Sequence, residues 1–114
     1  FGIVSPDFRN YIDLDRKNSE IYGATKAGII QITKYFSVYF SDLNIRVNCV
    51  SPGGIFDPQN PQGPEFIKKY TDKVPLKRMA NVNEIVQPIL FLCSNKASYV
   101  NGHNLIIDGG LTAW

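Results

Sequence analysis

Residues 19–42 constrain the fold more than any other segment, because they contain no proline and predict a helix that is apolar on most of its faces. The only glycines, Gly23 and Gly28, lie near the start of the segment. A segment of this length forms a helix of about six turns. A helix that is apolar nearly all round is buried on two sides, so we expect one side on the chain's own sheet and the other on a partner subunit.

Two short apolar segments predict strands. Residues 44–51 alternate in polarity and run into Pro52, Gly53 and Gly54, and residues 104–108 run into a second Gly-Gly pair. Such alternation indicates a strand, and glycines after it leave the backbone free to approach another group closely.

The segments between and before these strands predict helices and loops. Residues 65–73 have the pattern of a short amphipathic helix. Residues 81–94 start with the spacing of a capping box and predict a helix, although Pro88 falls inside it. Residues 1–19 and 57–64 are rich in polar residues and proline and predict loops. Strands separated by helices imply a parallel sheet in an α/β fold.

Composition narrows the class of protein. The chain has 114 residues, of which 44% are hydrophobic and 19% charged, with a net charge of +2, so we expect one domain with its own core and no nucleic-acid partner. Cys49 and Cys93 lie in apolar surroundings and predict buried free thiols in the cytoplasm, although a disulfide between them stays open. No apolar run reaches the roughly 20 residues of a membrane span, and we expect no metal site, because His103 is the only histidine and no Cys-x-x-Cys pair occurs. Because the chain begins at Phe1 rather than Met, we expect it to be truncated or processed.

Tyr22 and Lys26 form the sharpest chemical pair. Residues four apart share one face of a helix, so both side chains can reach one ligand. A phenol has a pKa of about 10, and a nearby cation favours the phenolate and brings it toward the working range of a base. A Tyr-x-x-x-Lys spacing also arises by chance, in which case it is a packed tyrosine and a solvated lysine.

The order of motifs resembles the C-terminal half of the short-chain dehydrogenase/reductase family. The resemblance covers nearly all of the chain after about residue 18, and as a combination it is highly specific. The motifs that carry it are Tyr22 to Gly28, Ile45-Arg46-Val47-Asn48, Pro52-Gly53, Pro75-Leu76-Lys77-Arg78, Glu84-Ile85, Phe91-Leu92, Val100-Asn101-Gly102 and Ile107-Asp108-Gly109-Gly110.

The resemblance implies a fold and a site. The fold would be the C-terminal part of a Rossmann-like, doubly wound parallel sheet, three-layered α/β/α in the full-length parent, with residues 1–114 as half of one NAD(P)-binding domain whose glycine-rich half lies outside this chain. Tyr22 would be the catalytic general acid/base, and Lys26 would lower its pKa and bind the nicotinamide ribose. The turn that would contact the nicotinamide of NAD or NADP consists of Pro52, Gly53, Gly54 and Ile55.

Some family features are missing. Asp57 stands where many relatives have a threonine that contacts the cofactor, and an acid there would repel phosphate. No G-x-G-x-x-G run occurs in the chain. The family's catalytic serine is expected upstream of Phe1, which makes Ser5 an ordinary loop residue.

These observations predict an oxidoreductase that transfers a hydride between NAD(P) and an alcohol or ketone, active as the full-length protein and inactive as this fragment. We expect a cytoplasmic homodimer or homotetramer acting on a carbohydrate-related or acyl-carrier-linked substrate, with the loop around residues 56–73 lining the substrate site. Two alternatives remain open: an NAD-using epimerase or dehydratase of the extended family, and a catalytically incomplete oligomerisation fragment.

Overall fold

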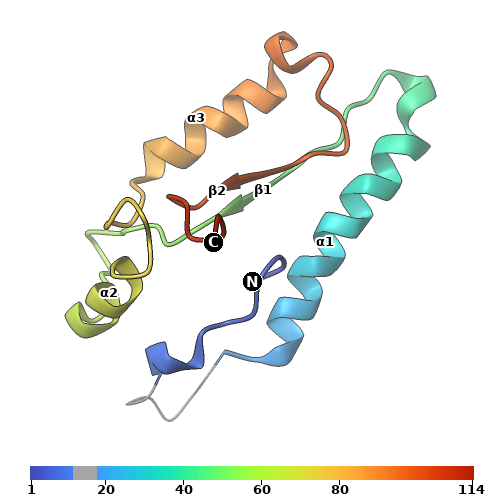
Figure 1. The fold of residues 1–114 in the computed structure, drawn as a ribbon. Coiled ribbons are helices and arrows are strands. Elements are labelled where there is room, and N and C mark those ends of the chain that lie inside the picture. The colour runs from blue at the N-terminus through green and yellow to red at the C-terminus, as the bar shows by residue number, and fades with distance from the viewer. Residues whose placement is uncertain (12–17) are drawn as a thin grey trace.

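The computed structural model describes residues 1–11 and 18–114. Over these residues the chain forms a two-stranded sheet with helices on both sides (Figure 1). The α-helices and strands, in chain order, are α1 (Glu20–Tyr39), β1 (Cys49–Pro52), α2 (Pro64–Thr71), α3 (Val82–Cys93) and β2 (Asn104–Ile107). Three short 3-10 helices occupy Phe8–Tyr11, Ser41–Leu43 and Asn95–Ala97.

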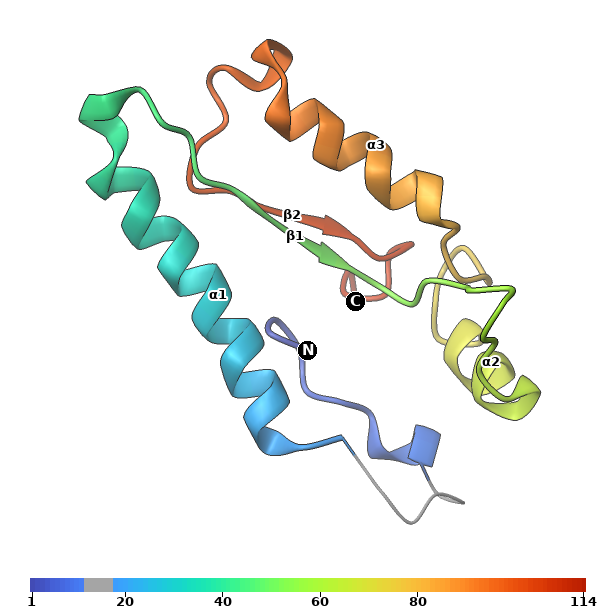
Figure 2. The same ribbon diagram turned by 180° about the vertical axis from the view of Figure 1, so that it is seen from behind.

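The two strands pair in parallel, as predicted. The register runs from Cys49 opposite Asn104 to Pro52 opposite Ile107. In both ribbon views α1 and α3 lie on opposite sides of this sheet, while α2 lies beyond the ends of the strands (Figures 1 and 2). Helix α2 therefore lies beyond the C-terminal ends of the two parallel strands.

β1 is shorter than predicted. The sequence predicts a strand over residues 44–51, but regular pairing begins only at Cys49. Before that point side chains make the contacts that a ladder would make, because the Val47 N–H donates to Asn101 Oδ1 (2.9 Å) and the Asn48 amide donates to the Val100 carbonyl (2.9 Å). The alternating pattern is real, but its only partner strand among the described residues starts at Asn104.

Helix α1 confirms the prediction for residues 19–42, with Ser19 as N-cap accepting a hydrogen bond from the Ile21 N–H (3.2 Å). Its buried residues are Thr33 and Ser37, however, rather than its large apolar side chains. Small side chains let the backbone approach closely: a Cβ on Gly102, the residue of φ +71° that faces the helix, would lie 2.7 Å from Ser37 Oγ. The expectation of an apolar side on the sheet is therefore wrong for this stretch.

Helix α3 begins with the predicted capping box. The Glu84 N–H donates to Asn81 Oδ1 (3.2 Å), and Glu84 Oε2 accepts from the Asn81 N–H (2.9 Å). The helix continues through Pro88 to Cys93. The capping box and the buried contacts of Ile85 and Leu92 outweigh the one backbone hydrogen bond that the proline removes.

The buried core is smaller than predicted. Among the described residues, the buried hydrophobic side chains are Val74, Met79, Ile85, Leu92 and Ala97. The chain measures 51 × 28 × 28 Å with a radius of gyration of 16.0 Å, whereas a compact domain of this length has about 13 Å. The chain is therefore elongated, and the prediction of a self-contained core is wrong.

Other sequence predictions have mixed outcomes. Both cysteines are free, as predicted, but Cys93 is exposed and Cys49 is only half-buried, so the prediction of buried thiols is wrong for both. The loop predicted for residues 1–19 contains the 3-10 helix Phe8–Tyr11, and its residues 12–17 lie outside the described part. No helix in the described part is long and apolar enough to span a membrane. The same residues contain no cluster of three or more His, Cys, Asp or Glu that could hold a metal ion.

Candidate active site

The Tyr22–Lys26 pair lies in the first two turns of α1, on one face of the helix. The Lys26 ammonium lies 5.3 Å from the centre of the Tyr22 ring, in cation-π geometry. Phe1 contacts the same ring edge-on, with ring centres 6.2 Å apart. The Tyr22 side chain is 45% exposed, so its phenol remains accessible. The predicted pairing of a phenol with a cation is therefore present in the structure.

The turn of residues 52–55 continues the sheet beyond the last residue of β1. The Gly53 N–H donates to the Ile107 carbonyl (2.9 Å). The Ala80 N–H then donates to the Gly54 carbonyl, and the Phe56 N–H donates to the Ala80 carbonyl, both at 2.9 Å. In this parallel bridge the groups beside Ile55 make the hydrogen bonds, so the N–H and C=O of Ile55 itself point away from Ala80.

Gly53 and Gly54 allow a close approach, but to parts of this chain. A Cβ on Gly53 would lie 2.9 Å from Asp108 Cα, and a Cβ on Gly54 would lie 2.7 Å from Tyr70 Cε1. Glycine is therefore needed at both positions for packing within the described residues. The sequence explains these glycines by the close approach of a ligand, and the structure adds a second explanation, the packing of the turn against Asp108 and Tyr70.

A cavity of about 400 Å³ joins the two predicted parts of the site. Tyr22, Pro52, Gly53 and Gly54 line it together, although they come from α1 and from the turn after β1. Lys26 and Ile55 are not among its lining residues. The other lining residues are Phe1, Gly2, Ile3, Val4, Ser51, Gln62, Phe66, Tyr70, Met79, Ile106, Asp108, Leu111 and Thr112.

Tyr70 belongs to the segment 56–73 that was expected to line the substrate site, but its contact with Gly54 was not predicted. Its hydroxyl oxygen accepts a hydrogen bond from the Gly54 N–H, and its ring stacks on Phe66 with centres 6.2 Å apart. Burial raises the pKa of the Tyr70 phenol above its usual value, although the Gly54 N–H opposes this, so the side chain stays neutral. The sequence identifies Phe66 and Tyr70 as the apolar face of an amphipathic helix within that segment, and nothing in it points to the Gly54 contact.

Asp108 is the charged lining residue of the cavity. Its Oδ1 accepts from the Gly110 N–H (2.9 Å), and its Oδ2 accepts from the N–H (2.9 Å) and hydroxyl (2.7 Å) of Thr112. Burial alone would raise the pKa of this carboxyl, but these hydrogen bonds outweigh burial and lower the pKa. The carboxylate thus holds the C-terminal turn in place.

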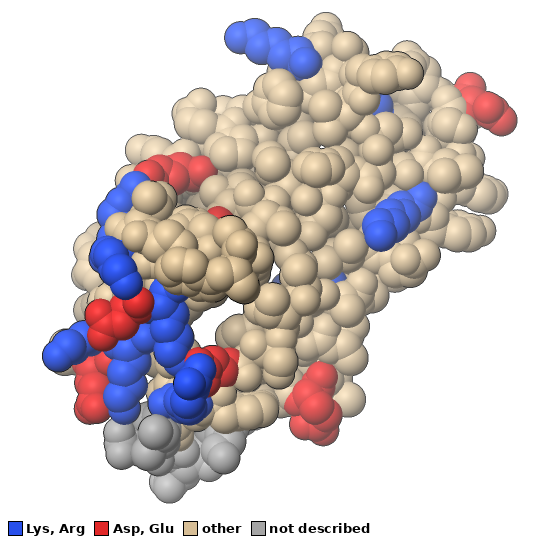
Figure 3. Space-filling model, viewed as in Figure 1, with Lys and Arg blue, Asp and Glu red and all other residues tan. Residues whose placement is uncertain are grey.

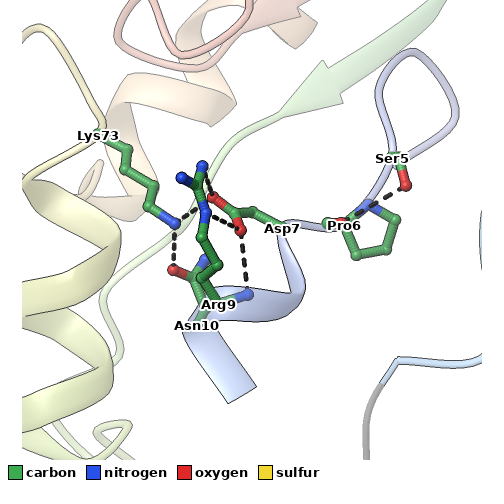
Figure 4. A network of polar contacts seen from close by, with 6 residues as sticks. All are labelled: Ser5, Pro6, Asp7, Arg9, Asn10 and Lys73. Atoms are coloured by element: carbon green, nitrogen blue, oxygen red, sulfur yellow. Dashed lines mark hydrogen bonds and ion pairs between the residues drawn. The ribbon is translucent and has the colours of Figure 1, made fainter. Parts of the chain in front are cut away.

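A polar network attaches the N-terminal segment to the residues after α2 (Figure 4). The Lys73 ammonium donates to Asp7 Oδ2 and to Asn10 Oδ1, and the Arg9 guanidinium forms two hydrogen bonds with Asp7, of 2.9 and 2.8 Å. Hydrogen bonds from Arg9, and next from Lys73, hold the pKa of the Asp7 carboxyl well below its usual range. The network thus ties the N-terminal segment to the end of α2.

Charges of both signs gather at the end of the molecule that carries α2. Figure 3 shows acidic and basic side chains together there, beside a hollow in the surface. Exposed ion pairs in this region include Lys69–Glu65 (3.0 Å) and Arg78–Glu84 (2.7 Å). Asp57 is exposed, and its Oδ1 accepts from the Gln59 N–H (2.9 Å), so this carboxylate closes a local turn.

The sequence of this chain is similar to those of known oxidoreductases. A family model described as enoyl-(acyl carrier protein) reductase matches residues 13–112. The D-arabinitol 2-dehydrogenase (ribulose-forming) of Candida tropicalis is 39% identical over 99 residues, which are 82% of this chain and 35% of that enzyme. The 3-oxoacyl-(acyl-carrier-protein) reductase FabG of Thermotoga maritima is 43% identical over 91 residues, which are 79% of this chain and 37% of that enzyme.

A solved structure shows the same arrangement of elements. The short chain dehydrogenase from Leptospira borgpetersenii with bound NAD+ has a TM-score of 0.87 and 46% identity, covering 97% of this chain and 41% of that one. The chain thus spans little more than a third of the curated relatives above.

Proposed function

The chain belongs to the short-chain dehydrogenase/reductase family of oxidoreductases, and from this premise we propose that it is the C-terminal half of an NAD(P)-binding Rossmann domain that interconverts an alcohol and a carbonyl compound. Its small share of the relatives' length supports the assignment to half of a domain. So do the exposed apolar side chains of α1 and α3, because contiguous apolar surface usually packs against further protein.

The observation that carries the proposal is the position of Tyr22. Its accessible phenol lies at the wall of the cavity that also contains Pro52, Gly53 and Gly54, with the Lys26 cation over its ring. At this place we assign to Tyr22 the role of general base toward an alcohol and of general acid toward a carbonyl oxygen.

The residues present fit the nicotinamide end of the cofactor. The outward N–H and C=O of Ile55 supply a donor and an acceptor of the kind that a carboxamide needs, and the Lys26 ammonium supplies three donors for ribose hydroxyls. The chain contains no G-x-G-x-x-G run for the pyrophosphate. We therefore assign only the nicotinamide side of the site to these residues.

In the proposed reaction a bound nicotinamide would supply the hydride chemistry, and the residues of this chain would move the proton. In the oxidative direction Tyr22 takes the proton of the substrate hydroxyl, and in the reductive direction it returns a proton to the carbonyl oxygen. The Lys26 ammonium, which lies beside Tyr22 on α1, would bind the ribose hydroxyls of the cofactor. The turn of residues 52–55 would hold its carboxamide through the backbone of Ile55.

The substrate side of the proposed site is the cavity wall formed by α2 and the loop before it. Phe66 and Tyr70 supply aromatic surface, and Gln62 and Thr112 supply polar groups. This lining fits a small alcohol or carbonyl compound, and the relatives include enzymes named for arabinitol and for acyl-carrier substrates. We further propose a homodimer or homotetramer, which would cover apolar residues of α1 such as Ile32 and Tyr39, and a reducing cytoplasmic environment, in keeping with two free cysteines.

Substituting Tyr22→Phe in the complete protein that contains this chain tests the proposal. We expect turnover of a polyol or 3-oxoacyl substrate, followed by NADH absorbance, to fall by at least about 100-fold, while NADH affinity measured by fluorescence stays within about threefold. Tyr99→Phe makes the same change on a fully exposed ring outside the cavity, and this control variant should keep its activity. Full activity of Tyr22→Phe would refute the assignment, and turnover without net change in NADH would favour the epimerase alternative.

A further inference from the structure

Helix α2 contacts the cofactor-side turn through one side chain. Tyr70, near the C-terminal end of the helix, accepts a hydrogen bond from the Gly54 N–H through its hydroxyl oxygen. The aromatic ring also lies close against the turn, because a Cβ on Gly54 would come within 2.7 Å of Tyr70 Cε1 and 2.8 Å of Cζ. The helix and the turn therefore share both a hydrogen bond and a van der Waals contact.

The same turn presents the free backbone groups of Ile55. The N–H of Gly54 is held by Tyr70, and the C=O of Gly54 is held by the Ala80 N–H at 2.9 Å. The C=O of Gly54 and the N–H of Ile55 belong to one planar peptide unit. Tyr70 and Ala80 thus fix two successive peptide planes, the second of which sets the direction of the Ile55 N–H.

The helix is attached to the N-terminal segment as well. Its Phe66 packs edge-on against Tyr11, with ring centres 6.2 Å apart. Just beyond the helix, the Lys73 ammonium donates to Asp7 and Asn10 (Figure 4). Helix α2 therefore connects the N-terminal segment to the turn of residues 52–55. Tyr70 makes the hydrogen bond between the helix and the turn.

We propose that Tyr70 is a positioning residue that couples the seating of α2, on the substrate side of the cavity, to the conformation of the turn of residues 52–55, on the cofactor side. This inference rests on the proposed function, because it takes the turn as part of the nicotinamide site. Coupling between two sites is reciprocal: a ligand that orders the turn also orders α2. The neutral state of the buried phenol keeps its oxygen available to the Gly54 N–H without placing a second charge beside Asp108.

Hydrogen exchange of the complete protein with and without NADH measures this coupling directly. We expect NADH to slow exchange of the amides of α2 in the wild type. In Tyr70→Phe, which removes only the hydroxyl group, this NADH-dependent protection should fall about fivefold, or about 1 kcal/mol, the usual worth of one hydrogen bond. Tyr99→Phe removes the same group from a fully exposed ring and should keep the protection.

Retained protection of α2 in Tyr70→Phe, or an absence of NADH-dependent protection in the wild type, would overturn the inference. Gly54→Ala breaks the same contact from the other side, by a steric clash with the ring, and should also uncouple α2 from NADH. If Tyr70→Phe fails to fold, retained protection in Gly54→Ala overturns the coupling. Failure of the proposed function gives a different result, namely a wild type that does not bind NADH or a Tyr22→Phe variant with full turnover.

Discussion

Replacing Gly53 with alanine should destabilise the protein by about 2 kcal/mol, and the structure gives the reason. The added Cβ would lie 2.9 Å from the Cα of Asp108 and 3.1 Å from its Cβ. The closest of these atoms is backbone, so no side-chain rotation relieves the clash. Overpacking of this kind costs about 1–3 kcal/mol.

Two further terms modify this cost. Moving Gly53 away from Asp108 strains the last sheet hydrogen bond, from the Gly53 N–H to the Ile107 carbonyl, which is worth about 1 kcal/mol. Asp108 cannot yield easily, because its carboxylate accepts hydrogen bonds from Gly110 and Thr112. Alanine also lowers the conformational entropy of the unfolded chain, which stabilises the folded protein by about 0.4–1 kcal/mol and offsets part of this cost.

The assay compares Gly53→Ala with Gly28→Ala by urea unfolding, with circular dichroism as the signal. Gly28 lies in α1 with no atom within 4 Å of its added Cβ, so alanine there should stabilise the helix by about 0.5–1 kcal/mol. The two substitutions make the same chemical change, so opposite signs isolate the clash. A Gly53→Ala protein as stable as the wild type would refute the reasoning.

Two electrostatic predictions concern exposed ion pairs. Hydrogen bonds from Arg78, and next from the Asn81 N–H, lower the pKa of Glu84 from its ordinary 4.5 to about 2. The ionised Glu84 side chain therefore stabilises the folded protein fully above about pH 4.5, and this contribution is lost as the pH falls toward 2. The free energy of unfolding of Glu84→Gln should therefore lie below that of the wild type at neutral pH, with a gap that closes over this window; a gap independent of pH contradicts the assignment. Asp7→Asn should lower Tm slightly at low salt and not at about 1 M salt, since its partners Arg9 and Lys73 are exposed to screening; an equal loss at both salt concentrations would show that the pairing is not the cause.

The elements and the Tyr22–Lys26 pair were predictable because they depend on neighbours in the sequence. The capping box of Asn81 and Glu84 joins residues three apart, and a lysine four residues after a tyrosine lies on the same helical face wherever the helix packs. The parallel order of the strands also follows from helices placed between them. These predictions needed no knowledge of tertiary contacts.

The tertiary structure alone decided which distant residues complete the site. Tyr70 reaches Gly54 across 16 positions, and Asp108, the residue after β2, packs against Gly53. It also decided that α1 buries Thr33 and Ser37, the latter against Gly102, where close backbone approach selects a small side chain over the apolar ones that the pattern favoured. Local hydrogen bonds and helical spacing depend on residues that are close together in the sequence, whereas these contacts depend on how separate segments pack together.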